Sequence, residues 1–445
     1  MFRKNSKLTI KLSSLFLALL LCLSLTSCFN FGSSGGNLGP IINGNVNSSQ
    51  NSEFPELDLI HQLFEQLSVY DLDREVLMTA VLKAYAEATG DVYAAYYTPE
   101  ELEAVTSDNQ GEMQGIGVSV VNDVLDIDGF NYSVLTIISV FQGSPALDAG
   151  LRMGDHVYAV TNSEGETHTV QELGYDNAIA SIRGVSGTKA AFIVLRPVAG
   201  GTYEQLTFEI ERKKITTESV TGRVYEVDPT IGIIKIAQFD LTTPTQFSAT
   251  MDSLIEKGCR KFIFDVRYNP GGDLASIEAV LSTFLQKGDV MISTVYKNGT
   301  GTSDKVDVVN SHTGAYASCN VSKKDIGKYR GYEFAVLTNE YTASAAELFT
   351  SNLRDYELAT LVGVTTYGKG CMQSMYDLAY WGVPGALKLT TAWYLPPSGE
   401  NYHDIGIAPD IEVKLDESLI EEYGNVYLIP DDKDPQLMAA VNALK

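Results

Sequence analysis

The sequence predicts a multidomain α+β protein with an N-terminal helical region, a strand-rich module and an α/β core. Three patterns lead to this fold class. Apolar residues recur at helical spacing after residue 55, short β-rich runs and glycine-containing turns fill residues 111–213, and strands alternate with helices over residues 214–445. A chain of 445 residues is long enough for two or three domains, each with its own core.

The first 27 residues have the features of an export signal. Cationic residues precede an apolar run, Leu12 to Leu25, which is shorter than the roughly 20 residues needed to span a bilayer. The run ends in Leu25-Thr26-Ser27-Cys28, which resembles the lipobox of bacterial lipoproteins. This resemblance implies lipidation of Cys28 and a location on the extracytoplasmic face of a bacterial membrane. An ordinary secretion signal with an incidental cysteine is the alternative.

Residues 28–54 are rich in Gly, Asn and Ser and carry almost no charge. Such a segment cannot bury enough apolar surface to order itself, so we expect a flexible tether. Residues 55–110 form the predicted helical region, and a second helix begins near Val76. The first predicted helix of this region has its apolar residues at Leu57, Ile60, Phe64 and Leu67.

Residues 111–213 read as a compact module of about 100 residues, dominated by strands. Two helical stretches interrupt the strands, one around Ala146 and one over 170–182. The expected strands are 115–121, 133–140, 155–160, 189–195 and 205–211.

Residues 214–445 alternate between the two kinds of element, as in an α/β layered core. Apolar runs at 261–267 and 333–338 predict strands, and each is followed by a helical pattern, over 274–286 and 343–355.

Charge and cysteine content exclude several classes of protein. The net charge of −24 argues against nucleic acid as a partner, because phosphate binding needs clustered Lys and Arg. The cysteines that follow Cys28, namely Cys259, Cys319 and Cys371, have no framework spacing, and no His/Cys cluster suggests zinc. We therefore expect no disulfide, metal or cofactor.

Ser344 and Lys369 are candidates for a nucleophile and its base. A serine hydroxyl needs a base within hydrogen-bond reach, and none of the five histidines stands in a convincing context. A neutral lysine can serve, since burial lowers a lysine pKa by up to roughly 3–5 units. Lys369 lies between Gly368 and Gly370, which permit a sharp turn that directs the side chain inward.

Ser344 also fits a structural role. Ser344-Ala-Ala-Glu347 matches a capping box, in which an N-cap Ser and an N3 Glu satisfy free amides at a helix start. The two roles are compatible, because a nucleophile at a helix N-terminus gains from the helix dipole. The amide of Ala345 would then be free to stabilise an oxyanion.

The Asn-Pro-Gly-Gly turn at the end of the 261–267 strand is a candidate for the second half of the oxyanion hole. Without side chains, Gly271 and Gly272 would let a substrate carbonyl approach a backbone N–H. The sequence leaves open which glycine donates, and an ordinary turn that closes a strand is the alternative.

Three segments occur in the order found in one protease family: Asp265–Gly272, Thr342–Glu347 and Tyr367–Gln373. Together with Tyr96–Leu102 and Gly406–Ile411, they make the chain similar to the carboxyl-terminal processing, or tail-specific, serine proteases. The resemblance implies a catalytic core of the crotonase/Clp-protease type. It also implies a Ser-Lys dyad of Ser344 and Lys369, with Gln373 orienting the lysine.

The strand-rich module resembles a PDZ domain through three motifs: Gly115-Ile116-Gly117-Val118, Gly143–Ala146 and Ala149–Asp155. In that resemblance, Gly115 to Val118 form the loop that binds a peptide carboxylate, while the peptide adds as a strand to the sheet edge. Protein or peptide C-terminal tails are therefore the expected substrates, and the sequence leaves a regulatory adaptor protein open as a further partner.

The chain departs from the family pattern at Tyr341, Thr342, Ala346 and Cys371, none of which removes a catalytic group. Cys371 lies two residues from the candidate base, so one expectation is that modification of its thiol inhibits the enzyme. The alternative is that Cys371 only fills a small buried space. Two other functions stay open: a tail-binding scaffold with an inactive core, and a Ser-His-Asp hydrolase that uses His403 and Asp404. As chain neighbours, those two side chains are expected to point to opposite sides.

Overall fold

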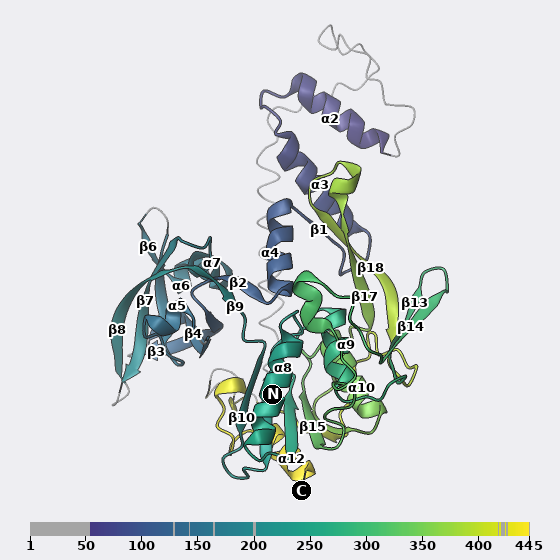
Figure 1. Ribbon diagram of the computed structural model, residues 1–445. Helices are drawn as coiled ribbons and strands as arrows, with labels where there is room; N and C mark the ends of the chain where they lie inside the picture. The colour runs from purple at the N-terminus through teal and green to yellow at the C-terminus, as the bar shows by residue number, and fades with distance from the viewer. Residues whose placement is uncertain are drawn as a thin grey trace, which may run out of the picture. The chain divides into compact units, whose positions relative to one another are not determined.

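The computed structural model describes residues 54–127, 130–141, 143–162, 165–198, 202–416, 418–419, 423 and 426–444. The described chain divides into two compact units between Met78 and Thr79. Helix α2 (Pro55–Leu67) lies in the first unit, and α3 (Arg74–Ala88) begins there and ends in the second (Figure 1). The predicted signal segment and almost all of the predicted tether, with Cys28, lie outside the described residues.

The predicted helical region contains one element that the sequence did not indicate. A short strand, β1 (Ala95–Tyr97), pairs antiparallel with β18 (Ala386–Leu395), so its backbone belongs to a sheet built from the C-terminal half. The helix that follows, α4 (Pro99–Asn109), has a complete capping box: Thr98 accepts from Glu101 N, and the Glu101 carboxylate accepts from Thr98 N.

The strand-rich module contains a six-stranded sheet in the order β3-β4-β5-β7-β8, with β6 paired to β5. Its buried core includes Leu135, Ile137, Phe192 and Val194, which alternate along their strands toward one face. The bounds of the module's strands are β2 (Glu112–Gly115), β3 (Val118–Ile127), β4 (Phe130–Val140), β5 (His156–Thr161), β6 (Thr167–Thr169), β7 (Lys189–Val198), β8 (Thr202–Glu211) and β9 (Lys213–Thr216). The helices are α5 (Pro145–Asp148), α6 (Val170–Leu173) and α7 (Tyr175–Ile182).

Glycines interrupt two of the predicted elements in this module. The run expected as one strand from 115 to 121 is broken at Gly117, whose φ is 85°. The helical stretch expected over 170–182 is split into α6 and α7 at Gly174, whose φ is 77°. Strand β9 crosses the predicted boundary at residue 213, because it pairs antiparallel with β2.

The largest sheet of the core has the order β10-β11-β12-β15-β16-β19 and is parallel apart from the β10–β11 pair. Alternate residues of its strands enter different cores: Phe262 and Phe264 pack with α8, α9 and α10, whereas Ile263 packs with α12. The sheet is thus covered on both faces. The bounds are β10 (Val220–Val224), β11 (Ile231–Ile236), β12 (Lys261–Asp265), β15 (Glu333–Thr338), β16 (Ala359–Gly363), β19 (Ile411–Glu412), α8 (Thr243–Glu256), α9 (Leu274–Ser282), α10 (Ala345–Asp355) and α12 (Pro435–Ala443).

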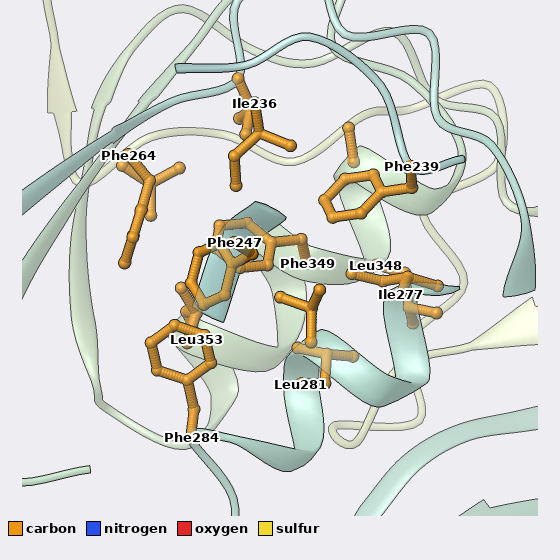
Figure 2. Close-up of a cluster of buried hydrophobic side chains, with 14 of the residues drawn as sticks. Ile236, Phe239, Phe247, Phe264, Ile277, Leu281, Phe284, Leu348, Phe349 and Leu353 are labelled. Carbon is orange, nitrogen blue, oxygen red and sulfur yellow. The ribbon is translucent and has the colours of Figure 1, made fainter. Parts of the chain in front are cut away.

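Phenylalanines dominate the larger of these cores. Figure 2 shows Phe247, Phe349 and Phe284 packed together among aliphatic side chains of the surrounding helices. Most of the rings meet edge-on or tilted, as for Phe264 against Phe349 at 5.4 Å and 83°, a geometry that aromatic quadrupoles favour. Helix α10 is buried from Ala345 to Leu353, so its first turn has little freedom to move.

A second sheet of the core, in the order β1-β18-β13-β14 with β17 paired to β18, was not predicted from the sequence. Its other strands are β13 (Val290–Tyr296), β14 (Gly301–Lys305) and β17 (Cys371–Asp377). Three short 3₁₀ helices complete the described elements: η1 (Gly314–Cys319), η2 (Leu378–Trp381) and η3 (Val426–Leu428).

Two predicted core helices are shorter than the sequence suggested. The pattern over 274–286 ends as α9 at Ser282, and the pattern over 343–355 begins as α10 only at Ala345, because Ser344 has a left-handed backbone. Among the described residues, none of the helices is both long and apolar enough to cross a membrane.

Candidate active site

Ser344 lies between β15 and α10 in a strained backbone conformation. Its φ and ψ are 58° and −119°, a region that non-glycine residues rarely adopt. The residues around it are buried, while Ser344 itself is half-buried. Strain of this kind persists only where neighbouring structure over-determines it, and it concentrates at functional sites.

The backbone of Ser344 is fixed by Glu347, which is fully buried in the first turn of α10. Ser344 N donates to Glu347 Oε2 at 2.9 Å, so the predicted capping box supplies this bond. The same carboxylate reaches the loop after β16: Lys369 N donates to Oε2 at 2.7 Å, and Gly368 N and Thr366 Oγ1 both donate to Oε1 at 2.6 Å.

Glu347 therefore accepts four hydrogen bonds and joins the serine to the loop that carries the lysine. Burial raises the pKa of Glu347, and the hydrogen bonds from Thr366, Lys369, Gly368 and Ser344 act in the opposite direction. The sequence showed Glu347 only as a capping residue. Its contacts with the loop arise from folding, since Lys369 lies 22 residues further along the chain.

Lys369 is half-buried between two glycines, and the packing leaves no room for a side chain at either glycine. A Cβ at Gly368 would lie 2.9 Å from Gly406 N, and one at Gly370 would lie 2.5 Å from Asn401 Oδ1. Burial lowers the pKa of Lys369 from its ordinary value. This environment favours the neutral amine that a base requires.

Four further groups act on the amine of Lys369. The positive charge of Lys388 also lowers the pKa of Lys369, whereas Cys371 and Glu347 raise it. Lys369 Nζ lies 4.7 Å from the centroid of the Tyr93 ring, a cation–π contact that favours the charged amine and so opposes the effect of burial. Burial raises the pKa of Tyr93 to about 12. Sequence reasoning missed Tyr93, which comes from a loop before β1 and has no motif that relates it to Lys369.

The Asn-Pro-Gly-Gly turn packs directly against the serine. A Cβ added to Gly271 would lie 2.7 Å from Ser344 Cβ and 2.8 Å from Ala345 N, so this position cannot hold a side chain without displacing the serine. Gly271 N donates to Asn269 Oδ1 at 2.8 Å and is occupied. The N–H groups of Gly272 and Ala345, by contrast, have no acceptor among the described residues.

Gln373 lies on β17, two residues after Cys371. Its amide nitrogen donates to Cys371 Sγ at 3.2 Å and to Thr390 Oγ1 at 3.4 Å. Thr390 in turn donates through N and Oγ1 to the carboxylate of Asp91, at 2.8 and 2.9 Å. This chain of contacts leads from Gln373 to the loop that carries Tyr93, and the expected role of Gln373 in orienting Lys369 stays a prediction.

The end of β12 is anchored by a buried ion-pair network. Arg267 donates from Nε and Nη2 to the two oxygens of Asp265, at 2.9 and 2.7 Å, and from Nη1 to Asp434 Oδ2 at 2.9 Å. Asp434 caps the N-terminus of α12 through Gln436 N and Leu437 N. The paired charges hold the strand end from which the Asn-Pro-Gly-Gly turn departs.

His403 and Asp404 differ from expectation. His403 Nε2 lies 3.7 Å from Asp404 Oδ1, because Asp404 has a φ of 59° and the chain turns instead of remaining extended. The two neighbouring side chains therefore do not point to opposite sides, contrary to expectation. The His403 ring packs against Trp393 at 4.7 Å and Tyr93 at 6.5 Å, and its Nδ1 is buried with no partner among the described residues.

In the strand-rich module, the residues from Gly115 to Val118 connect β2 to β3. A Cβ at Gly117 would lie 2.3 Å from Ser144 Cβ, so the loop is packed closely against the start of α5. These residues line a cavity of about 270 Å³, together with Phe141 and side chains of α7 such as Ile179. Strand β3 stands at the end of its sheet and pairs on one side with β4.

Apart from the contact of Cys371 with Gln373, the described cysteines supply no bond to the site. Cys259, Cys319 and Cys371 are buried free thiols. Within the described ranges, no three His, Cys, Asp or Glu side chains are grouped so as to hold a metal ion.

Comparison with known proteins supports one class, the serine-type peptidases. Residues 230–413, which contain Ser344, Lys369 and both candidate oxyanion glycines, match the model of Peptidase family S41. Over most of its length the chain is similar to the carboxy-terminal processing proteases of Bacillus subtilis (strain 168). It is 28% identical to CtpA over 368 residues, covering 83% of this chain and 70% of that protein. It is likewise 28% identical to CtpB over 370 residues, covering 83% and 69%.

The fold is shared with a solved S41 protease structure from Bacteroides fragilis NCTC 9343. The TM-score is 0.54, with 16% sequence identity, over 84% of this chain and 92% of the other. The mixed helix-and-sheet fold that the sequence predicted is thereby confirmed. The crotonase-type core and the PDZ module are finer expectations and stay predictions.

Proposed function

We propose that the chain is an exported, lipid-anchored serine endopeptidase of the carboxyl-terminal processing type, with Ser344 as nucleophile and Lys369 as base. The observation that carries this proposal is the carboxylate of Glu347, which accepts hydrogen bonds from the backbone N–H of both residues. One buried group thus fixes the positions of the serine and of the lysine loop relative to each other.

The chemistry follows from these groups. Neutral Lys369 takes the proton from Ser344 Oγ as that oxygen attacks the scissile carbonyl. The N–H groups of Ala345 and Gly272 are available to stabilise the oxyanion, and the Gly271 N–H is already bonded to Asn269. When the tetrahedral intermediate collapses, Lys369 returns the proton to the leaving amine. Water then attacks the acyl-enzyme, with Lys369 again as base.

Substrate selection is assigned to the strand-rich module as a PDZ domain. Among the described strands, β3 has one unpaired edge. This edge and the cavity beside Gly115 to Val118 suit an extended peptide that ends in a carboxylate. Unfolded or disordered protein tails are the proposed substrates. Two matched unfolded substrates, one with a free C-terminal carboxylate and one amidated, test this assignment, and equal KM values for both would remove it.

Cleavage tests the activity itself. Purified full chain is incubated with an unfolded protein that ends in an apolar tail, beside the Ser344→Ala and Lys369→Ala variants. Cleavage by the unaltered chain alone is the expected result. Full cleavage by both variants would contradict the mechanism, and binding of the tail without cleavage by any form would favour the inactive scaffold.

The lipid anchor rests on the lipobox-like sequence before Cys28. Expression of the chain and of its Cys28→Ala variant in a bacterium, followed by fractionation, tests it. The unaltered chain is expected with the membranes and the variant in the soluble extracytoplasmic fraction. The same distribution of both forms would contradict the anchor.

A further inference from the structure

Two exposed tyrosines stack on each other beside the candidate active site. The rings of Tyr268 and Tyr341 have centroids 5.0 Å apart and planes 12° apart, and the side chains are 42% and 54% exposed. Aromatic rings stabilise a protein mainly by burying apolar surface, and two rings that stack at the protein surface bury only part of theirs. The pair therefore leaves ring surface available for another group.

The pair is held rigidly. Asn339 Oδ1 accepts hydrogen bonds from Tyr268 N at 2.9 Å and from Tyr341 N at 3.2 Å, so one amide oxygen fixes both backbones. Tyr268 has a φ of 62°, a left-handed conformation that is a clear outlier for a bulky residue. Tyr427 packs against Tyr268 at 6.0 Å and donates its hydroxyl to Arg267 O at 2.7 Å.

The pair is continuous with the groups proposed for catalysis. Tyr341 precedes Ser344 by three residues, and Tyr268 precedes Gly271 by three. The two segments are joined beyond the tyrosines, where Ala343 N donates to Asn269 O at 2.9 Å. A substrate polypeptide that places its scissile bond next to the Ser344 side chain would therefore pass close to the two rings.

We propose that Tyr268 and Tyr341 form a substrate platform that binds an aromatic side chain of the polypeptide near its scissile bond. This inference rests on the proposed function and deepens it. The ring of Tyr268 contacts the rings of Tyr341 and Tyr427. A substrate ring would therefore join a cluster of rings that the protein has already ordered. Preformed rings bind a further ring by offset stacking with little loss of conformational freedom. Acidic side chains are disfavoured, because Glu340 adjoins Tyr341 and the chain carries a net charge of −24.

Binding to an inactive variant of the full chain tests the platform. Ser344→Ala is titrated with fluorescent peptides of one unstructured alanine- and serine-based sequence, in which a single Phe occupies successive positions. The peptides are amidated at the C-terminus, so that they lack the carboxylate a PDZ loop would bind. One or two adjacent Phe positions are expected to lower Kd roughly three- to tenfold relative to the parent peptide.

Removal of either ring from the Ser344→Ala background should abolish that gain. Tyr341→Ala removes the outer ring, and Tyr268→Gly removes the other while supplying a residue that tolerates a positive φ. Tyr341→Phe keeps the ring and should keep the gain. Tyr380→Ala removes another exposed tyrosine, 86% exposed in η2, and should leave all Kd values unchanged.

The platform would be overturned if Phe lowered Kd as much in Tyr341→Ala and Tyr268→Gly as in their Ser344→Ala parent. It would also be overturned if Phe lowered Kd at none of the positions. A stronger gain from Glu than from Phe would also overturn it. Because the readout is equilibrium binding to a chain that lacks the nucleophile, it is independent of cleavage. Failure of the proposed protease activity is seen separately, as absence of cleavage by the unaltered chain.

Discussion

Ser344 and Lys369 donate their backbone N–H groups to the same oxygen, Glu347 Oε2, at 2.9 and 2.7 Å. The carboxylate is fully buried, and its other oxygen accepts from Thr366 and Gly368. The proposed nucleophile and base are thus positioned through backbone atoms, which leaves both side chains free for chemistry. Glu347 is a positioning residue in this arrangement, and its replacement gives the first prediction.

Replacement of Glu347 by Gln should lower kcat while leaving KM nearly unchanged. A Gln has one acceptor oxygen in place of two, so two of the four donors lose their partner. We expect kcat to fall roughly 100-fold, as for a misplaced catalytic group. The free energy of unfolding should fall by about 1–3 kcal/mol for the unsatisfied buried groups. Steady-state kinetics and urea denaturation measure the two effects.

Glu278→Gln is the matched control. Burial raises the pKa of Glu278 to about 8, so at pH 7 this carboxyl is largely protonated and a neutral amide resembles it closely. Its kcat and stability should change much less than those of Glu347→Gln. Equal losses in the two variants would show that Glu347 acts only as a buried polar group.

Removal of the positive charge of Lys388 should move the pH profile of activity. Lys388 lowers the pKa of Lys369, so Lys388→Met should raise it. Lys369 must be neutral to act as a base, hence activity rises as pH increases through its pKa. The rise should move to higher pH in Lys388→Met, with lower activity at pH 7 and recovery in alkaline buffer.

The profile of kcat/KM against pH gives this measurement. Lys414→Met, which removes a lysine whose side chain is 79% exposed, serves as control and should leave the profile in place. A movement to lower pH in Lys388→Met would contradict the assignment of Lys369 as the base.

Gly271→Ala should abolish activity by steric conflict. The new Cβ would lie 2.7 Å from Ser344 Cβ, and the residue would keep a φ of 102° that disfavours side chains. We expect a loss of at least roughly 100-fold in kcat, comparable with removal of an oxyanion donor. Gly399→Ala has the same backbone conflict, with a φ of 79°, but open space around its Cβ. Similar kinetics for the two variants would show that the turn does not constrain the serine.

His403→Phe distinguishes the lysine mechanism from a Ser-His-Asp mechanism. Phe keeps the ring that packs on Trp393 and Tyr93, and it removes a buried Nδ1 that has no partner among the described residues. Activity should stay within about tenfold of the unaltered chain, far above that of Lys369→Met, since removal of a general base costs roughly 100- to 10,000-fold. A loss in His403→Phe as large as in Lys369→Met would favour the histidine.

Much of the fold could be predicted from local patterns in the sequence. The runs 261–267 and 333–338 are short and apolar, and they form β12 and β15 at the centre of the six-stranded sheet of the core. A capping motif indicated the start of α10. The sheet built from β1, β13, β14, β17 and β18 had no such signal, because its strands are partly exposed and draw partners from distant parts of the chain.

The same difference between local motifs and distant contacts decides which parts of the candidate active site could be predicted. Ser344, Lys369 and the two glycines could be inferred because each stands in a motif of adjacent residues. The bonds from Glu347 to the lysine loop, the ring of Tyr93 beside Lys369, and the stack of Tyr268 on Tyr341 join segments far apart in sequence. Likewise, the bond from Gly271 N to Asn269 depends on turn geometry that composition does not encode.

Chemical labelling of Ser344 tests the central claim most directly, because it reports nucleophilicity without a substrate. A fluorophosphonate that reacts with activated serines is added to the full chain and to its Lys369→Met variant across a range of pH, and the labelled peptide is identified by mass spectrometry. We predict label on Ser344 alone, at a rate that rises with pH through the pKa of Lys369, and almost none in the variant. Label at another residue, or equal rates in the two proteins, would contradict activation of Ser344 by Lys369.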